Sequence, residues 1–496
     1  MDKRGKNLIK KTKVSYVKIL VLGFFLFSLS AGTIFLMSSG TFGEQRPMLK
    51  AAPLNPEFVR YLKEREMGKS RIQYTASGHP LGLLPAPLDL SQLQSLPAIH
   101  SIDYALPATY DLRTKNKLTR VKDQGTCDSS WAFATYGSLE SFLRPGATRD
   151  FSEQNLIDHH GFDSKPCDGG NIFMSTAYLA RWLGPINETD DRYVYLPVDG
   201  LTPKKHVQNV IWLPRRLSST DNSEIKNAAM KYGAVYVSMK WVDSCYKEIN
   251  YAYYNEGTNE GGHSVTIVGW DDNFSKSKFN SAPSGNGAFI VRNSWGATWG
   301  QSGYFYVSYY DKYFGKESFN IVFQAEPVTN YKTNYGYDDL GWVNGIGWNG
   351  NSTAWFANIF TASAAGSIKA VSFYTSSTSS NVYDISIYTN VSANKPTSGQ
   401  KAANKKGTIT SPGYFTVPLS TFPAIIKGKK FSVVVKLTTK DYYYPIPVEY
   451  PIVNYSNKAK AKLGQSFASP DGTTWHDICG WANGNTNACL KAFTKY

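Results

Sequence analysis

Residues 124–134, Gln-Gly-Thr-Cys-Asp-Ser-Ser-Trp-Ala-Phe-Ala, have the types and spacing of a site for nucleophilic chemistry. They run from a glycine-containing loop into a helix predicted from Trp131 to Phe142, and Pro145-Gly146 ends that helix. A side chain in the first turn lies at the positive end of the helix dipole, where a developing anion is stabilised. The chain places Ser130 at this position.

A candidate base and a candidate orienting amide come much later in the chain. His263 follows two glycines at the start of an apolar run, and Asn293 opens the sequence Asn-Ser-Trp-Gly. A lone histidine before an apolar strand is more often structural than catalytic, and Asn-Ser-Trp-Gly alone could be a tight turn. A hydroxyl, an imidazole and an amide work together only if the fold brings them to one point.

The elements that must position these groups come in two sets. Helices are predicted first, at 172–183 and 223–232 after the central one, with Ser152 as the N-cap of a short helix between them. Strands are predicted next, and their ranges are 234–241, 263–270, 288–295 and 303–310. Helices followed by strands indicate an α+β fold with two lobes.

Together, the motifs resemble the papain-like cysteine peptidases over roughly residues 106–325. They occur in the family's order, and they are Leu106-Pro107 with Asp111-Leu-Arg113, Gln124, Trp131, Phe151-Ser-Glu-Gln154, Cys167-Asp-Gly-Gly170, His263 and Asn293-Ser-Trp-Gly296. The resemblance implies a helical lobe with the nucleophile, a stranded lobe with the base, and a Cys127–Cys167 disulfide. It implies catalytic positions at Gln124, Ser130, His263 and Asn293, and substrate-binding positions at Asp128, Gly169, Gly170, Asn171 and Trp295.

Three positions depart from the family pattern. Ser130 stands where the family has cysteine, Asp128 where it usually has glycine, and Gly262 where relatives often have Asp or Asn. A serine hydroxyl is a far weaker acid than a thiol with a pKa near 8.5, so it cannot form the resting ion pair with His263. A misplacement of about 1 Å can also cost on the order of 100-fold in rate. We therefore predict that peptidase activity is lost or reduced by orders of magnitude.

Three functions remain open at this point. The first is an impaired papain-family protein that binds peptides or partners in its cleft, acting as a non-catalytic surface protein. The second is a serine-type hydrolase that uses Ser130, His263 and Asn293. The third is an active cysteine peptidase whose nucleophile was replaced for study.

Five cysteines fit an oxidising compartment. Besides the pair already named, Cys479 and Cys489 are predicted to form a second disulfide, which leaves Cys245 as a free thiol. No metal site or cofactor is predicted from histidine and cysteine spacing.

The N-terminus predicts export. Residues 3–18 are basic and residues 19–37 form an apolar run without a charge, so residues 1–40 are predicted to be a signal peptide or an uncleaved signal anchor. The protein is then secreted or on the cell surface, with a membrane contact through this segment if it is not cleaved.

Residues 41–104 are predicted to be a connector or a short pro-segment. Residues 57–69 can form a short charged helix, and the proline-rich run 80–90 is suited to lying extended along a groove. A cover over the cleft and a linker on the domain surface are the two alternatives.

Residues 326–496 form the second predicted domain, an all-β sandwich. Alternating runs separated by turn clusters occur at 368–375, 382–389, 413–419 and 431–438. Their place after the papain-like part resembles the lectin-like domain of some bacterial and archaeal surface peptidases. Five tryptophans could stack on sugars, although each is more often a core residue, and they are Trp342, Trp348, Trp355, Trp475 and Trp481. Asp338-Asp339 is a weak calcium candidate.

The net charge of +15 on 496 residues favours attraction to an anionic cell wall, glycan or membrane. Nucleic acid is not a predicted partner, because no arginine follows Arg292 and no nucleic-acid motif is visible. The predicted partners are a peptide substrate or ligand and a cell-wall or surface glycan.

Overall fold

The computed structural model describes residues 48–69, 74–91 and 105–496, apart from positions 195, 318, 349 and 483. The predicted signal segment, residues 1–40, lies outside the described residues. Within the described ranges, no helix combines the length and apolar character that a membrane span needs.

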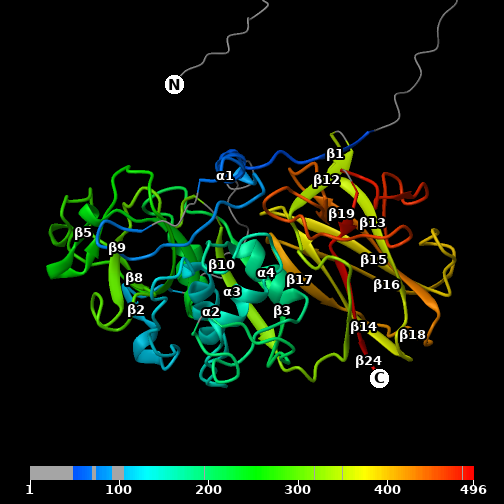
Figure 1. Ribbon diagram of the computed structural model, residues 1–496, viewed down its shortest axis with the longest axis horizontal. Coiled ribbons are helices and arrows are strands. Elements are labelled where there is room, and N and C mark those ends of the chain that lie inside the picture. The colour runs from blue at the N-terminus through cyan, green and yellow to red at the C-terminus, as the bar shows by residue number, and fades with distance from the viewer. Residues whose placement is uncertain are drawn as a thin grey trace, which may run out of the picture. The chain divides into compact units, whose positions relative to one another are not determined.

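Five α-helices occur in the described ranges (Figure 1). They are α1 (Pro56–Glu66), α2 (Ser130–Leu143), α3 (Glu153–His159), α4 (Ile172–Ala180) and α5 (Ser223–Tyr232). Side chains of Asn55, Ser152 and Asn171 cap α1, α3 and α4 by accepting backbone N–H bonds. Helix α5 ends at Gly233 as predicted, whereas α4 ends earlier than predicted because Trp182 takes a left-handed φ of 64°.

The largest sheet has 14 strands and passes through both halves of the chain. Its order is β11 (Thr333–Tyr335), β24 (Leu490–Lys495), β14 (Gly366–Thr375), β17 (Gly413–Pro418), β3 (His206–Leu213), β10 (Asn320–Glu326), β4 (Val235–Lys240), β7 (Gly262–Asp271), β8 (Ala288–Arg292), β9 (Tyr304–Ser308), β6 (Ala252–Tyr253) and β5 (Tyr246–Lys247). In addition, β2 (Thr109–Asp111) pairs with β7, and β18 (Ala424–Ile425) pairs with β14. The four strands predicted for the base-bearing lobe correspond to β4, β7, β8 and β9.

The two halves of the chain meet at the pairing of β3 with β17. Tyr414 lies opposite Val210 in this antiparallel pair. A Cβ on Gly413 would lie 2.1 Å from the Val210 carbonyl oxygen, so glycine is required at this close approach. Beside this pair, the rings of Trp212 and Trp342 stack at 5.4 Å. The junction is therefore a continuous sheet with an aromatic core beneath it.

Two further sheets complete the C-terminal half. One has the order β16 (Gln400–Ile409), β15 (Asn381–Thr389), β19 (Lys430–Thr439), β13 (Thr353–Thr361), β21 (Ser466–Ser469) and β22 (His476–Asp477). The other has the order β1 (Leu49–Ala51), β12 (Asn344–Trp348), β20 (Ile446–Glu449) and β23 (Asn487–Ala488). Alternating side chains such as Ile385, Ile387, Val433 and Val435 are buried between the sheets. The predicted β-rich architecture is confirmed.

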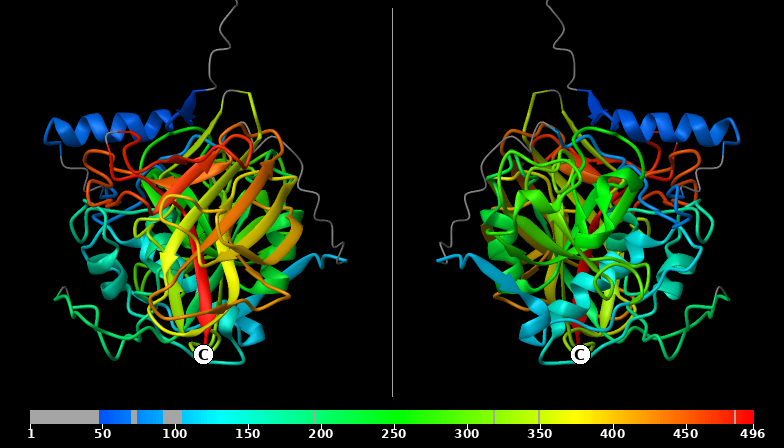
Figure 2. Two further views of the ribbon diagram at one scale, coloured as in Figure 1. Left: turned by 90° about the vertical axis from the view of Figure 1, so that its right-hand side faces the viewer. Right: turned by 90° about the vertical axis from the view of Figure 1, so that its left-hand side faces the viewer.

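The described N-terminal segment contacts the C-terminal half before it reaches the N-terminal half. Leu49 pairs with Trp348 where β1 adds to β12. The Phe58 ring of α1 then meets the Tyr455 ring edge-on, with centroids 4.8 Å apart. Figure 2 shows α1 beside the orange and red loops of the C-terminal half. This path brings residues 74–91 to the start of α2.

Candidate active site

Ser130 is the first residue of α2, at the end of the helix where the sequence placed a nucleophile. Its side chain is completely buried, and its Oγ accepts a hydrogen bond from the Ser264 amide at 3.1 Å. The turn beside it fits closely, since a Cβ on Gly170 would lie 2.3 Å from the Trp131 ring. The hydroxyl is thus held in a tight, dry position between α2 and β7.

His263 and Asn293 lie together at the starts of β7 and of the loop after β8. The imidazole Nε2–H donates to Asn293 Oδ1 at 2.8 Å, and the Trp295 ring stacks on the imidazole at 4.9 Å. The Ser294 amide donates to the same Oδ1 at 2.8 Å, which fixes the amide's orientation. The fold therefore gathers the imidazole, amide and indole as the resemblance implied, while their catalytic roles stay predictions.

The imidazole of His263 is neutral at pH 7. Burial lowers its pKa to about 4, against the smaller opposing effects of the Asn293 hydrogen bond and the Leu81 backbone. Its Nδ1 has no hydrogen-bond partner among the described residues. Ser130 Oγ is consequently not bonded to the base that would have to take its proton.

Gln124 and the amide of Ser130 converge on one oxygen. Gln124 Nε2 and the Ser130 N–H donate to the Leu81 carbonyl at 3.1 and 3.3 Å. Gln124 is itself oriented by the Ser294 hydroxyl, which donates to its Oε1 at 2.6 Å. Two donors aimed at one carbonyl oxygen are the geometry of an oxyanion hole, and here the protein's own backbone fills it.

Residues 79–84, called the strap below, lie in this site and are bonded along their length. The Trp295 indole N–H donates to the Pro80 carbonyl at 3.0 Å, and the Leu81 N–H donates to Asp128 Oδ1 at 3.2 Å. Further along, the Gly170 amide donates to the Gly82 carbonyl at 3.0 Å. Two more strap amides bond outward, Leu83 to the Gly262 carbonyl at 3.2 Å and Leu84 to the Gly170 carbonyl at 2.8 Å. The strap thus uses the backbone edge that the sequence assigned to a substrate.

Two glycines allow this close approach. Gly82 has a φ of 113°, and a Cβ there would lie 2.4 Å from the backbone carbon of Asp128. A Cβ on Gly262 would lie 3.1 Å from the Leu83 carbonyl oxygen. Sequence reasoning singled out Gly262 but missed Gly82, whose signal was a glycine inside an otherwise apolar proline-rich run.

Asn171 and Gly169 also contact the strap or the residue that follows it. Asn171 Oδ1 caps α4 through the Phe173 amide at 3.1 Å, while its Nδ2 donates to the Pro85 carbonyl at 3.2 Å. Gly169, with a φ of 85°, lets the Gly82 carbonyl come within 3.1 Å of where its Cβ would be. Both predicted substrate-binding positions therefore border the strap.

Comparison with known proteins assigns each half of the chain. The model of the papain family cysteine proteases matches residues 106–322, and the model of the lectin like domain matches residues 334–494. This chain contains a papain-family domain followed by a lectin-like domain.

Two curated relatives are matched over less than half of this chain. A cathepsin L-like peptidase of Aedes aegypti is 29% identical over 227 residues, which cover 42% of this chain and 60% of that protein. Cathepsin L1 of Drosophila melanogaster is 30% identical over 215 residues, 40% of this chain and 53% of that protein. The chain thus spans less than two thirds of the length of these relatives.

Two solved structures extend the likeness to both domains. One contains the cysteine protease and lectin-like domains of Cwp84, a surface layer associated protein of Clostridium difficile; it is 25% identical, has a TM-score of 0.74, and the match covers 90% of this chain and 98% of that one. The other is the clostridial cysteine protease Cwp84 after propeptide cleavage, 26% identical with a TM-score of 0.67, covering 78% of this chain and 99% of that one.

Of the two predicted disulfides, one is confirmed and one is wrong. Cys127 and Cys167 are bonded, which ties the loop before α2 to the glycine turn of the papain-like domain. Cys479 and Cys489 are free thiols, as is Cys245. Cys489 points into the core shared with Trp342, whereas its neighbour Ala488 faces the sandwich core, so the thiol is turned away from the loop that carries Cys479.

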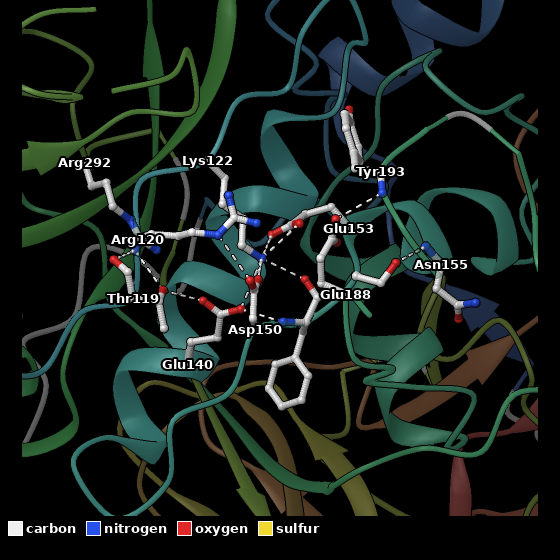
Figure 3. Close-up of polar contacts among 12 residues, drawn as sticks. Thr119, Arg120, Lys122, Glu140, Asp150, Glu153, Asn155, Glu188, Tyr193 and Arg292 are labelled. Carbon is white, nitrogen blue, oxygen red and sulfur yellow. Dashed lines mark hydrogen bonds and ion pairs between the residues drawn. The ribbon is translucent and has the colours of Figure 1, made fainter. Parts of the chain in front are cut away.

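A buried charge cluster behind the site was not predicted. The ammonium of Lys122 lies 3.3 Å from Glu140, 2.8 Å from Glu153 and 2.7 Å from Asp150 (Figure 3). Burial raises the pKa of Glu153 to about 8, with Lys122 opposing the rise. Burial lowers the pKa of Lys122, but the three acids outweigh this and raise it above its usual value. The cluster anchors the chain two residues before Gln124 and so helps to position the Gln124 side chain.

The tryptophans predicted to stack on sugars differ in their burial within the lectin-like domain. Trp342 and Trp348 are buried in cores, while Trp355 is partly buried against a small apolar cluster on the outer face of the six-stranded sheet, with the Lys436 ammonium 4.8 Å above its ring. Trp475 and Trp481 are also partly exposed.

Asp338, the calcium candidate, is buried and pairs with the Lys491 ammonium at 2.6 Å. This ammonium already supplies the positive charge that a cation would bring. No group of three or more histidine, cysteine or acidic residues suited to a metal occurs in the described part of the chain.

Proposed function

We propose that this protein is an exported, surface-associated member of the papain family that has lost peptidase activity and uses its cleft to hold an extended peptide. In the present arrangement that peptide is the protein's own strap. The lectin-like domain would bind a cell-surface glycan. Residues 1–40 would direct export, and residues 41–104 would act as a pro-segment.

One observation carries the proposal. The Leu81 carbonyl accepts hydrogen bonds from the Gln124 side chain and the Ser130 amide, and the Ser130 hydroxyl is bonded to the Ser264 amide and not to His263. Serine must lose its proton during attack, so a hydroxyl without a bonded base leaves this peptide intact. For the same reason we do not propose a serine-type hydrolase.

The departures from the family pattern support peptide holding. Asp128 supplies a carboxylate to the Leu81 amide, and Gly262 makes room for Leu83. Asp128 and Gly262 therefore both favour binding of the strap in the cleft, and neither departure from the family pattern assists bond cleavage.

The relatives support location and a removable segment. The Cwp84 structures concern a surface layer associated protein, and one of them was determined after propeptide cleavage. A basic protein with a lectin-like domain is also suited to an anionic wall.

Peptide holding is tested by offering the strap in trans. A fluorescent peptide of residues 77–88 is titrated into the wild-type chain and into Gly82→Ala, whose added Cβ would clash with the Asp128 backbone. Gly78→Ala is the matched control, because Gly78 has a φ of 87° but nothing within 4 Å of a Cβ. We expect binding to Gly82→Ala only, with the peptide intact by mass spectrometry. Cleavage of the peptide, or equal binding to all three proteins, would overturn the proposal.

Glycan binding is tested on the full chain with purified wall polymers. We expect retention of the wild type and reduced retention of Trp355→Ala, with Tyr443→Ala as a control for loss of an exposed aromatic side chain elsewhere. Lack of retention of the wild type on any wall polymer would remove this part of the proposal.

A further inference from the structure

Residues 420–430, Ser-Thr-Phe-Pro-Ala-Ile-Ile-Lys-Gly-Lys-Lys, form an exposed segment at one end of the lectin-like domain. Its strand β18 pairs with the start of β14, where Ala424 lies opposite Ser367. Lys495 of β24 lies opposite the same Ser367 from the other side. Figure 1 shows these three strands together near the C-terminus. Residues 420–430 with Lys369 and Lys495 are called the basic end below.

Two large apolar side chains of the basic end are exposed to solvent. Phe422 is 51% exposed and Ile426 is 61% exposed. Burial alternates along residues 422–426, since Pro423 and Ile425 are buried and the other three are exposed. In an extended chain alternate residues lie on the same side, so Phe422, Ala424 and Ile426 share the outer side. Apolar residues grouped on a surface, unlike single ones, indicate an interaction site.

Lysines surround these apolar side chains. The Lys369 ammonium lies 3.8 Å from the centre of the Phe422 ring. Directly after Ile426 the chain turns, with the Lys429 amide donating to the Ile426 carbonyl at 3.0 Å. This turn exposes three lysines, and Lys495 on the neighbouring strand is exposed as well; the three are Lys427, Lys429 and Lys430.

The positive charge of the basic end is not compensated locally. Residues 361–369, 420–430 and 494–495 contain no aspartate or glutamate. Within the described part of the lectin-like domain, the ion pairs are those of Lys406 with Asp384 and of Lys491 with Asp338. The lysines of the basic end therefore produce a positive field that attracts an anionic partner.

The combination of apolar side chains and lysines distinguishes between anionic partners. A soluble polyanion, such as a wall polymer, would contact the lysines but leave Phe422 and Ile426 in water. A bilayer with anionic lipid accommodates both, because apolar side chains enter the boundary between headgroups and acyl chains while lysine ammonium groups stay at the headgroups. The pattern of the basic end therefore favours a membrane surface.

We propose that the basic end binds the surface of a membrane that contains anionic lipid. Phe422 and Ile426 would insert at the headgroup boundary, and the surrounding lysines would contact the lipid phosphates. This inference goes beyond the proposed function, because it involves neither the cleft nor the sheet face that carries Trp355.

Sedimentation with lipid vesicles tests the proposal. The protein is residues 47–496, which form one compact unit and leave out the apolar run 19–37. Vesicles of phosphatidylglycerol mixed with phosphatidylcholine are compared with vesicles of phosphatidylcholine alone. We expect binding to the anionic vesicles that is at least about tenfold tighter and that weakens with added salt. Equal binding to both vesicles, or binding to neither, would overturn the proposal.

Two double variants separate the apolar and the charged contributions. Phe422→Ser with Ile426→Ser should weaken binding to anionic vesicles at least about tenfold, because both side chains lose their burial in lipid. Lys427→Gln with Lys429→Gln should weaken it about 25-fold, since each lysine at an anionic surface contributes about fivefold. All four side chains are exposed, so the variants should keep the fold, which circular dichroism checks.

Matched controls come from elsewhere on the lectin-like domain. Val382→Ser with Tyr443→Ser removes apolar side chains that are 48% and 50% exposed, and Val382 pairs with Thr438, at the opposite end of β19 from Lys430. Lys406→Gln with Lys440→Gln removes the same charge as the lysine variant.

The four variants give distinct outcomes. We expect both control pairs to bind anionic vesicles as the wild type does. Binding that is lost with the lysine variant but unchanged in Phe422→Ser with Ile426→Ser would indicate a polyanion site and overturn the membrane proposal. Equal weakening by the control pairs would contradict the assignment to the basic end.

Discussion

Replacing Asp128 with alanine should loosen the strap by an amount that the structure allows us to calculate. The Asp128 carboxylate is 2% exposed and accepts the Leu81 amide at 3.2 Å. A hydrogen bond to a charged group contributes ~1.5–3 kcal/mol, and each 1.4 kcal/mol is a factor of ten. We therefore expect the Leu81 amide to exchange with deuterium about 10- to 100-fold faster in Asp128→Ala. Asp128→Asn keeps an acceptor oxygen without the charge, so its effect should be smaller.

The assay is amide hydrogen exchange on the folded chain, read at the strap residues. Asp123→Ala is the matched control, because Asp123 lies in the same loop but accepts the Gly125 amide at 2.8 Å and no strap amide. Amides in the core of β7 serve as a reference for global unfolding. Leu81 exchange that is unchanged in Asp128→Ala, or raised equally by Asp123→Ala, would refute the assigned role of this carboxylate.

The remaining predictions concern acid stability, the disulfide and the sandwich face. Burial lowers the pKa of His160 to about 3, below its unfolded value near 6.5, so its contribution to stability is full above pH 6.5 and is lost as the pH falls toward 3. In urea unfolding between pH 6.5 and 3, the wild type and the exposed-site control His476→Gln should lose free energy of unfolding on the order of 3 kcal/mol, and His160→Gln should not show this loss. An equal dependence of the free energy of unfolding on pH in all three proteins would contradict this. Reduction of the Cys127–Cys167 bond, which closes a loop of 40 residues, should lower the free energy of unfolding by about 4 kcal/mol; no change in the denaturation midpoint with reductant would count against it. Trp355→Ala should leave the melting temperature within a few degrees of the wild type, because this ring is only partly buried and lies outside the main sandwich core, and a large drop in melting temperature would contradict this.

Motif order predicted which residues lie together, because each motif carries a local physical constraint. The helix start at Ser130, the glycine turn and the His263–Asn293 pair depend on short-range chemistry, and the structure brings them together. The bonding of Cys127 to Cys167 belongs to the same group, since the glycine turn packs against the start of α2.

Features that depend on long-range pairing could not be predicted in the same way. Nothing in residues 206–213 or 413–418 shows that β3 and β17 join the two domains in one sheet. The pairing of Cys479 with Cys489 was predicted from spacing alone, and spacing does not show which core a strand residue faces. The fit of Gly82 against Asp128 also requires knowing where the strap lies.

The central claim is that Ser130, in a cleft otherwise arranged like that of the papain family, leaves the site without peptidase activity. The most direct measurement is turnover of a fluorogenic peptide by Gly82→Ala and by the double variant Gly82→Ala with Ser130→Cys, because we expect the added Cβ to displace the strap in both. The account predicts no turnover with serine and measurable turnover with cysteine. Turnover by Gly82→Ala with serine in place, at rates ordinary for a cysteine peptidase, would contradict it.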